Sequence, residues 1–485
     1  MNNRDYEKKY DEFFLHLYGS EINNEKNDYL VSKNKYPHTY SINEKIDLTY
    51  LEVYSVDPEK CTDADDAFSI FYKDEKLFLA IHIADPTEYI QLNSELWNDI
   101  LEKNITKYPS NRKPFHLMPE KIIELSSLCE NSAGNLKNAI TVIFEIDEKT
   151  YEPINNPNLC FTTINVKKEN SYSYTSASKL YQTNKDFYIG KMINEALQRR
   201  RSKLTVGTKL NELKNSIVIF EEDNCFLQRD NEDVKSLKQM IAEFAILTNS
   251  YIGEFFKIFL EGNSIFRTCN TNDWIYTIDY NISGNELINK IIENGITANY
   301  QSNFDSHDLV GSTEYSHFTS PIRRVSDCIC HYLIKYVYLK ANNAIEKPFS
   351  EIFLSEISEK CASKFKKFKK IQYNDIKFRL VQVISNILRK NNEKNSNEEK
   401  KEKVRLTYRI VSYAGLFVNI LISKINDHNV HFSYTLRAKA TQFIHYSKEI
   451  REIYISEVNI TQKYDENTFP ALDKVIFSIF LGKNK

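Results

Sequence analysis

The stretch DPEKCTDADDAFSI, residues 57–70, places four aspartates just before an apolar run. Asp57, Asp63, Asp65 and Asp66 crowd like charges together, and such charges repel one another unless a cation compensates them. The run that follows, AFSIFY, has the composition of a buried β-strand and draws the aspartates toward the core, where an uncompensated carboxylate is costly. The stretch therefore predicts a cation site at the start of a buried strand; the alternative is an exposed acidic turn.

The cation expected from these ligands is Mg²⁺, with Mn²⁺ as a second candidate. A calcium loop counted from Asp63 would need glycine at its sixth position and glutamate at its twelfth, but the chain has Phe68 and Asp74 there. Carboxylate oxygens without histidine or cysteine ligands favour Mg²⁺ or Mn²⁺ over zinc. Several carboxylates are typical of phosphoryl-transfer sites, so the residue types indicate phosphodiester hydrolysis.

Composition narrows the class of protein. The chain has 485 residues, more than one core usually holds, so two or more domains are expected. Its 64 basic and 66 acidic residues give a net charge of −2, which neither predicts nor excludes a polyanionic partner. The eight cysteines form no CxxC pair and are expected to be reduced thiols. No apolar signal core or membrane-length apolar run is present, so a cytoplasmic protein without membrane contact is expected.

The order of apolar and polar runs predicts an α+β fold in four parts. These are a short N-terminal segment (1–45), a mixed α/β domain (46–390), a charged linker (391–403) and a small β-barrel domain of the OB type, suited to single-stranded nucleic acid (404–485). A hairpin is expected around the turn KDEK, because apolar strands flank it. Helical patterns cover roughly residues 119–128, 185–203, 232–260 and 321–340.

A second informative stretch is YSHFTSPIRRVSDCICHYLIKYVYL, residues 315–339. Ser320 is a suitable N-cap and Pro321 suits the first helical position, so the sequence predicts a helix that starts at Pro321. Arg323 and Arg324 then fall in the first turn, where positive charge is unfavourable for an isolated helix. A bound phosphate would reverse that cost. The alternative is an ordinary helix with two solvent-facing arginines.

Together these stretches resemble the ribonuclease II / RNase R (RNB) exoribonuclease family. The resemblance runs through most of residues 46–340 and is carried by TDADDA, LAIHIADPTEYI, HLMPEKIIELSSLCEN, EALQRRRSKLTVG, MIAEFAILTN, IFRT and YSHFTSPIRRVSD. It implies an RNB-type catalytic domain and a processive 3′→5′ hydrolase. Such an enzyme releases nucleoside 5′-monophosphates from single-stranded RNA with magnesium.

The same resemblance assigns roles to the two stretches. Asp57, Asp63, Asp65 and Asp66 are expected to hold the metal and to position the attacking water. Arg323 is expected to bind the scissile phosphate and to stabilise charge that develops in the transition state.

Further residues are expected to grip the end of the RNA. Tyr108 and Tyr174 would stack on bases near the 3′ end, with Tyr172 as an alternative to Tyr174. Glu243 would approach the terminal ribose, although a paired carboxylate is its ordinary interpretation in an apolar helix. Arg267 would contact RNA or pair with an acidic neighbour. The remaining expected RNA contacts are Thr319, Ser320 and Arg324.

The N-terminus differs from the family pattern, which usually begins with cold-shock-type β-barrels. About 45 residues cannot hold two such barrels, so RNA binding is expected to depend on the C-terminal β-domain. One rival interpretation is a catalytically silent RNB-like protein that binds RNA, which the presence of all four aspartates and Arg323 disfavours. Another is a phosphodiesterase limited to short oligonucleotides. A monomer is expected.

Overall fold

The aspartate cluster lies at one edge of a five-stranded sheet. The computed structural model describes residues 3–12, 18, 24–154, 156–221, 224–341, 345–394, 403–414, 417–437, 450–462 and 475–481. The sheet has the order β1 (Ile46–Asp47), β6 (Asn158–Asn165), β5 (Leu136–Ile146), β4 (Lys76–Ala84) and β3 (Asp66–Lys73). β1 is parallel to β6, and the other neighbouring strands are antiparallel.

The hairpin predicted around KDEK is confirmed. β3 and β4 pair from Asp66–Ile83 to Lys73–Lys76, and the two turn residues, Asp74 and Glu75, have positive φ angles. Such angles belong to the tight turns that join two antiparallel strands. β4 is buried along nearly its whole length, which explains why its sequence is apolar throughout.

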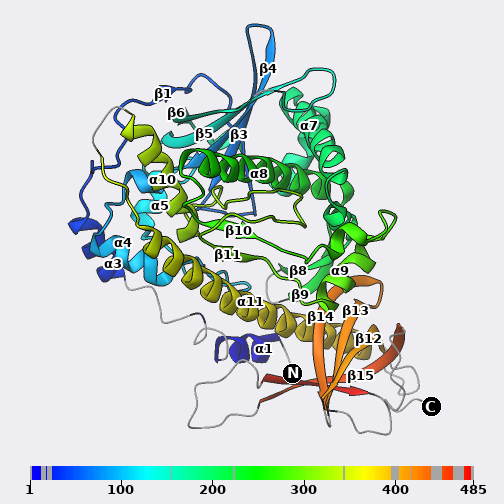
Figure 1. Cartoon of the computed structure of the whole chain (residues 1–485). Helices are drawn as coiled ribbons and strands as arrows, with labels where there is room; N and C mark the ends of the chain where they lie inside the picture. The colour runs from blue at the N-terminus through cyan, green and yellow to red at the C-terminus, as the bar shows by residue number, and fades with distance from the viewer. Residues whose placement is uncertain are drawn as a thin grey trace.

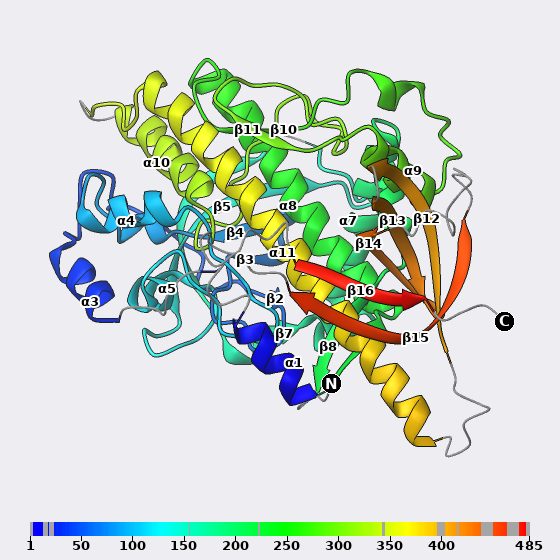
Figure 2. The same cartoon turned by 90° about the horizontal axis from the view of Figure 1, so that it is seen from below.

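Long helices pack beside this sheet, as Figure 1 shows. α7 (Lys185–Ser202) and α8 (Glu232–Phe259) both contact Phe68 of β3 through aromatic side chains, at ring-centroid distances of 5.5 Å for Phe187 and 5.6 Å for Phe244. α5 (Glu120–Ser126), α7 and α8 confirm three of the predicted helices to within a few residues. α11 (Glu351–Lys394) runs across the lower side of the molecule, with α1 (Asn3–Tyr10) beside it (Figure 2).

The remaining described elements are short. The helices are α3 (Asn24–Lys33), α4 (Glu95–Lys103), α6 (Tyr174–Ala177) and α9 (Gly284–Glu293). The strands form three pairs: β2 (Ser55–Asp57) with β7 (Ser171–Ser173), β8 (Ser216–Glu221) with β9 (Asn224–Arg229), and β10 (Phe266–Thr268) with β11 (Asn299–Gln301). None of the described helices is both long and apolar enough to cross a membrane.

The predicted start of the helix at Pro321 is wrong. α10 runs from Val325 to Lys340, and its N-cap is Arg324 in an extended conformation, not Ser320. Arg324 forms a β-bridge with Ile105, and the Arg323 carbonyl accepts a hydrogen bond from the Thr106 amide at 3.0 Å. This pairing with a distant segment holds the two arginines outside the helix.

A second five-stranded sheet follows α11. Its order is β14 (His428–Arg437), β13 (Phe417–Ile425), β12 (Val404–Ala414), β15 (Arg451–Gln462) and β16 (Val475–Leu481), and all its pairs are antiparallel. Within the described residues the two edge strands, β14 and β16, do not pair. The closed OB-type barrel is therefore not confirmed. α11 extends to Lys394, into the predicted linker, and residues 395–402 of that linker lie outside the described residues.

Candidate active site

Two strands bring the aspartates together. Asp57 ends β2, which lies beside β7 with Asp57 opposite Ser173. Asp66 begins β3, and the residues just before it are held by backbone contacts. The Asp65 carbonyl accepts a hydrogen bond from the Ala84 amide at 2.8 Å, and the Ala64 amide donates to the Ser127 hydroxyl at 2.9 Å. The cluster is thus part of the sheet edge.

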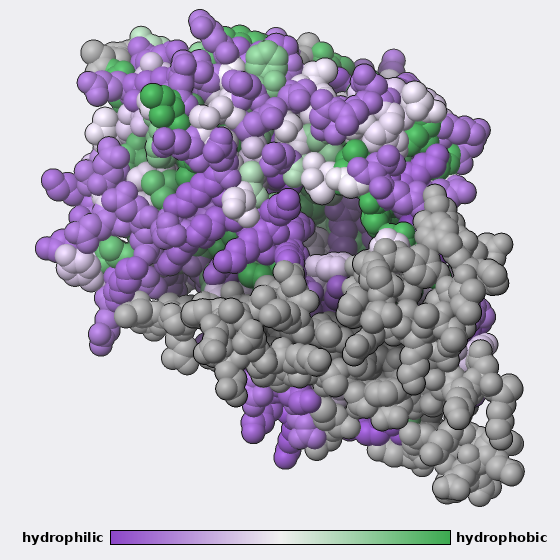
Figure 3. All heavy atoms as spheres, turned by 60° about the horizontal axis from the view of Figure 1, so that its bottom comes forward, coloured by the Kyte–Doolittle hydropathy of each residue, from purple (hydrophilic) through white to green (hydrophobic). Residues whose placement is uncertain are grey.

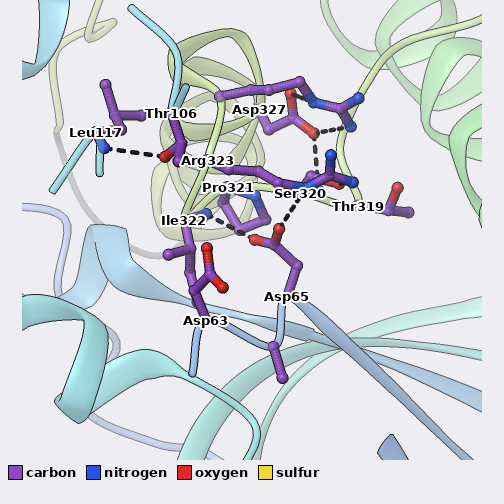
Figure 4. Close-up of polar contacts among 12 residues, drawn as sticks. Asp63, Asp65, Thr106, Leu117, Thr319, Ser320, Pro321, Ile322, Arg323 and Asp327 are labelled. Carbon is purple, nitrogen blue, oxygen red and sulfur yellow. Dashed lines mark hydrogen bonds and ion pairs between the residues drawn. The ribbon is translucent and has the colours of Figure 1, made fainter. Parts of the chain in front are cut away.

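Asp65 is bound to the segment that precedes α10. Its carboxylate accepts hydrogen bonds from the Ile322 amide at 2.8 Å and from Arg323 Nε at 2.9 Å, as Figure 4 shows. Arg323 Nη2 donates to the Ser320 hydroxyl at 2.7 Å. Asp65 is only 4% exposed, whereas the Arg323 side chain is 44% exposed. One edge of the guanidinium is therefore fixed while the group stays accessible.

Asp63 faces a different neighbour, the loop of residues 106–117. The Tyr108 hydroxyl donates to Asp63 Oδ2 at 2.8 Å, and His116 Nδ1 lies 3.6 Å from the same oxygen. The Cys61 thiol is 3.4 Å from the other carboxylate oxygen. This loop, which we call the Tyr108 loop, thus contacts the aspartate cluster directly.

Asp57 and Asp66 have raised pKa values. Burial is the main cause for Asp57, with the charges of Asp66 and Asp63 next, and its pKa is raised to about 7. Burial also raises the pKa of Asp66, to about 6, although the positive charges of Arg323 and Arg324 oppose the shift. In the part of the chain that the structure describes, neither carboxylate forms an ion pair with a basic side chain. The repulsion expected from the sequence is thus present around these two groups.

The donor chemistry of this cluster fits a hard divalent cation, but its present geometry is not closed around one. Carboxylate oxygens are the ligands that Mg²⁺ and Mn²⁺ prefer. Within the described residues, no three histidine, cysteine, aspartate or glutamate side chains converge on one ion position. Tyr108 and Arg323 engage the carboxylates of Asp63 and Asp65, so these two groups already have hydrogen-bond partners.

Arg324 has a structural partner. Its Nε and Nη2 atoms donate to the two carboxylate oxygens of Asp327 at 2.9 and 2.7 Å. Asp327 is fully buried and also accepts the Ser320 amide at 2.8 Å. Thr319 accepts a hydrogen bond from the side-chain amide of Asn249 at 3.3 Å and is buried. Arg324, Thr319 and Ser320 therefore stabilise the backbone conformation around Arg323. Contacts of these three residues with RNA stay predictions.

Tyr174, not Tyr172, lies beside the aspartates. It is the first residue of α6, and burial together with the nearby charges of Asp66 and Asp57 raises its pKa. Tyr172 instead packs edge-on against Phe187 in the core, with ring centroids 5.9 Å apart. Of the two alternatives, Tyr174 is the one near the aspartates, and its stacking on a base stays a prediction.

Glu243 and Arg267 are both buried. Glu243 forms an ion pair with Arg201 of α7 at 3.1 Å, and burial raises its pKa. Arg267 lies between the rings of Tyr300 and Phe365, with its guanidinium carbon 4.6 and 4.5 Å from their centroids. It forms no ion pair with an acidic residue in the described part of the chain, so the alternative of an acidic neighbour is not seen.

A small pocket opens beside Asp66. Asp66 and Thr319 line it together with Ile241, Phe244 and Ala245 of α8. Glu243 lies on the same helix, between two of these lining residues. The pocket thus lies between the end of the aspartate cluster and α8. This helix carries Glu243, for which a ribose contact is predicted.

Three site residues were not identified from the sequence. His116 approaches Asp63, Asp327 holds Arg324, and Asn249 holds the backbone of Phe318 and the side chain of Thr319. A signal existed only for Asp327, because an acidic residue three positions after an arginine can pair with it. The other two come from segments far away in the sequence.

Comparison with known proteins places this site in a family. The model of the RNB domain matches residues 45–340, more than half of the chain and the part that holds every candidate site residue. The chain belongs to the RNB family. Ribonuclease R from Helicobacter pylori is 23% identical over 328 residues, which cover 60% of this chain and 49% of the relative. The chain thus spans about half the length of that RNB protein.

Solved structures of RNB proteins have the same fold. Mycoplasma genitalium RNase R in complex with double-stranded RNA aligns with a TM-score of 0.71 and 17% identity, over 99% of this chain and 84% of the other. Yeast Ssd1, described as a pseudonuclease, aligns with a TM-score of 0.59 and 15% identity, over 83% of this chain and 51% of the other. At these identities the likeness shows the fold alone.

Proposed function

We propose that this RNB protein is a 3′→5′ exoribonuclease that hydrolyses single-stranded RNA to nucleoside 5′-monophosphates. One observation carries the proposal: four aspartates from β2 and the start of β3 lie together with Arg323, which comes from the segment before α10. A protein that only bound RNA would have no chemical reason to bury repelling carboxylates at a sheet edge. The arrangement is suited to a phosphodiester held between a cation and a guanidinium.

The site residues have two proposed roles, the stabilisation of charge and the binding of the RNA end. Arg323, fixed by Asp65 and Ser320, presents its accessible guanidinium to the phosphate of the terminal link and stabilises its oxygens as charge develops. Tyr108 and Tyr174 stack on bases near the 3′ end, where their rings flank the aspartates. Glu243, on the helix that lines the small pocket beside Asp66, is the residue proposed to approach the terminal ribose.

Asp57 and Asp66 are the first ligands that we propose for Mg²⁺, with Mn²⁺ as an alternative. Their carboxylates have no basic partner in the described residues, and Asp63 and Asp65 complete the set. When bound, the ion would supply Lewis acidity toward the phosphate and lower the pKa of the attacking water. A bound cation would also compensate the repulsion between the carboxylates of Asp57 and Asp66.

The lower face of the molecule offers an entrance for RNA. In Figure 3 the described residues on this face are largely hydrophilic, and a hollow lies near the middle of the view. We propose that a single strand enters here with its 3′ end first, and that the C-terminal sheet β12–β16 binds the strand behind it. Discrimination against DNA would come from contacts with the ribose 2′-hydroxyl groups.

The proposal is tested with a single-stranded RNA labelled at its 5′ end. The wild type is expected to shorten it from the 3′ end in Mg²⁺ and to leave it intact in EDTA. Asp65→Asn is expected to reduce turnover at least 100-fold, because it removes a charge from the cluster and the ionic partner of Arg323, while RNA affinity stays within about threefold. Asp74→Asn is the matched control: it makes the same chemical change in the exposed β3–β4 turn. RNA that is bound but stays full length in both Mg²⁺ and Mn²⁺ would show that the wild type is not a nuclease.

A silent RNA-binding protein is the second candidate. The pseudonuclease Ssd1 shows that this fold also occurs in a protein described as lacking nuclease activity. The same assay distinguishes the two, since a silent protein binds the labelled RNA without shortening it. A phosphodiesterase limited to short oligonucleotides would shorten a 5-nucleotide RNA but not a 30-nucleotide RNA.

A further inference from the structure

The Tyr108 loop (residues 106–117) is held at its base by the site and at its tip by two helices outside the RNB match. At the base, the Thr106 amide donates to the Arg323 carbonyl, and Lys107 pairs with Phe115 through two backbone hydrogen bonds of 3.0 and 2.9 Å. Beyond this pair the tip has no strand neighbour among the described residues. The backbone groups of the tip therefore need other partners.

α11 supplies the first set of partners. The Ser110 amide donates to Asp375 Oδ2 at 2.9 Å, and the Ser110 carbonyl accepts from Arg379 Nη2 at 2.9 Å. Asp375 is 2% exposed and Arg379 is fully buried. Two buried charged side chains thus form hydrogen bonds with the backbone of Ser110, two positions from Tyr108.

The N-terminal residues supply the second set. Arg112 forms ion pairs with Glu7 of α1 at 3.0 Å and with Asp11 at 2.7 Å. The Tyr18 ring stacks on Phe115 with centroids 6.0 Å apart and planes within 4°, and Lys107 donates to the Tyr18 carbonyl. Figure 2 shows α1 alongside α11, on the same lower side of the molecule.

The two sets are joined to each other. The hydroxyls of Tyr10 and Tyr18 donate to Asp375 Oδ2 at 2.8 and 2.9 Å, the oxygen that also accepts the Ser110 amide. Glu7 pairs with Arg379 at 2.6 Å. Helix α1, helix α11 and the loop tip therefore share one buried network of hydrogen bonds, and a shift of either helix would move the tip.

We propose that α1, Tyr18 and α11 form a clamp that positions the Tyr108 loop for the 3′ end of the RNA. Arg112, Asp375 and Arg379 are positioning residues, because they act on RNA only through Tyr108. The clamp rests on the proposed function and extends it: grip on the RNA end depends on residues outside the RNB match, which covers 45–340. An unclamped loop would spread its tyrosine over many positions and bind the last bases less often in the productive one.

The decisive variant is Arg112→Ala, because Arg112 is partly exposed and its loss leaves the Glu7–Arg379 pair in place. Arg112→Lys is the conservative rescue. Lys214→Ala is the matched control: it removes an exposed ion pair, with Glu232 at 2.7 Å, that does not involve the loop. Three experiments are made: steady-state kinetics on single-stranded RNA in Mg²⁺, which gives KM and kcat, fluorescence of a 3′-terminal 2-aminopurine bound in EDTA, and hydrogen exchange of the peptide covering residues 107–116.

For Arg112→Ala we expect amide exchange in the loop to rise at least tenfold and KM to rise about fivefold, with kcat within twofold of the wild type. The quenching of 2-aminopurine should weaken in parallel. Arg112→Lys should restore all three quantities to within twofold, and Lys214→Ala should match the wild type. The clamp is refuted if loop exchange is unchanged, or if exchange rises while KM and quenching do not change. Exchange and quenching need no cleavage, so they decide the clamp even if the wild type proves inactive and the proposed function fails.

Discussion

Arg323 combines a fixed edge with an accessible one. Nε is bound to Asp65 and Nη2 to Ser320, and the planar fork that makes both contacts cannot be reproduced by an ammonium group. We expect Arg323→Lys to lower turnover on single-stranded RNA by about 100-fold or more, with RNA affinity reduced about threefold or less. Turnover is read from the shortening of 5′-labelled RNA and affinity from filter binding.

The control for this change is Arg199→Lys, which makes the same substitution on the exposed last turn of α7. It should leave both quantities as in the wild type. Unchanged turnover in Arg323→Lys would remove Arg323 from the mechanism.

The raised pKa of Asp57 predicts how the stability of the protein depends on pH. Its pKa is raised to about 7, first by burial and then by Asp66 and Asp63, whereas an unfolded aspartate titrates near 3.9. Between these two values the native state binds more protons than the unfolded state, so without metal the free energy of unfolding falls as pH rises from about 4 to about 7. Asp57→Asn removes that cost. In EDTA its Tm should exceed that of the wild type by about 1–3 °C at pH 8, and this excess should nearly vanish at pH 4.

Thermal unfolding followed by circular dichroism at the two pH values checks this prediction. Asp74→Asn, in the exposed turn, should shift Tm at neither pH. A variant that is less stable than the wild type at pH 8 would show that repulsion does not dominate the environment of Asp57.

At the scale of elements, one buried ion pair stabilises the first turn of α10. The Asp327 carboxylate accepts hydrogen bonds from Nε and Nη2 of Arg324 and from the Ser326 hydroxyl. Removal of its charge by Asp327→Asn leaves a guanidinium largely buried without compensation, and we expect the free energy of unfolding to fall by about 3–5 kcal/mol. Ser326→Ala, which removes a single hydrogen bond to the same carboxylate, should cost about 1 kcal/mol. Urea unfolding measures both, and equal losses would contradict the assigned role of the pair.

The same region shows what local sequence can predict about an element. The β3–β4 hairpin depends on apolar runs and on two turn residues that are adjacent in the chain, so its position was predicted correctly. The start of α10 depends on Ile105 and Thr106, which pair with the arginines from a distant part of the chain. Ser320 and Pro321 are suitable for a helix start by local rules, but the long-range pairing overrides them. A local sequence pattern contains no information about a partner that is distant in the chain.

At the scale of the whole molecule, one hydrophobic core crosses the predicted domain boundaries. It contains Tyr6 and Tyr10 of α1, Phe378 of α11, and Val404 and Leu406 of β12. Segments that share a core are expected to unfold together.

Cooperative unfolding can be measured with two probes. Trp97 and Trp274 both lie within the predicted catalytic domain, whereas circular dichroism follows the whole chain. We expect tryptophan fluorescence and circular dichroism to give midpoints within about 1 °C of each other. An earlier transition seen by circular dichroism alone would show that the C-terminal sheet unfolds independently.

The candidate site was predictable to different depths. The aspartates and Arg323 were predicted as a set from their residue types and from the family resemblance, and the structure brings them near one another, while their roles stay predictions. The roles of Arg324 and Thr319 could not be read in this way, since a basic or hydroxyl side chain looks alike whether it contacts RNA or pairs with Asp327 or Asn249. The clamp on the Tyr108 loop was missed altogether. It joins three segments whose spacing in the sequence has no regularity.

The hydrogen bond between Tyr108 and Asp63 has a thermodynamic consequence. A cation that takes Asp63 as a ligand competes with the Tyr108 hydroxyl for the same oxygen. A ligand that moves Tyr108 away from Asp63 would remove this competition, and by reciprocity the bound cation would strengthen binding of that ligand by the same factor. Metal affinity and affinity for the RNA end would then be linked quantities. A protein built in this way would hold a bound metal ion most tightly when an RNA end is in place.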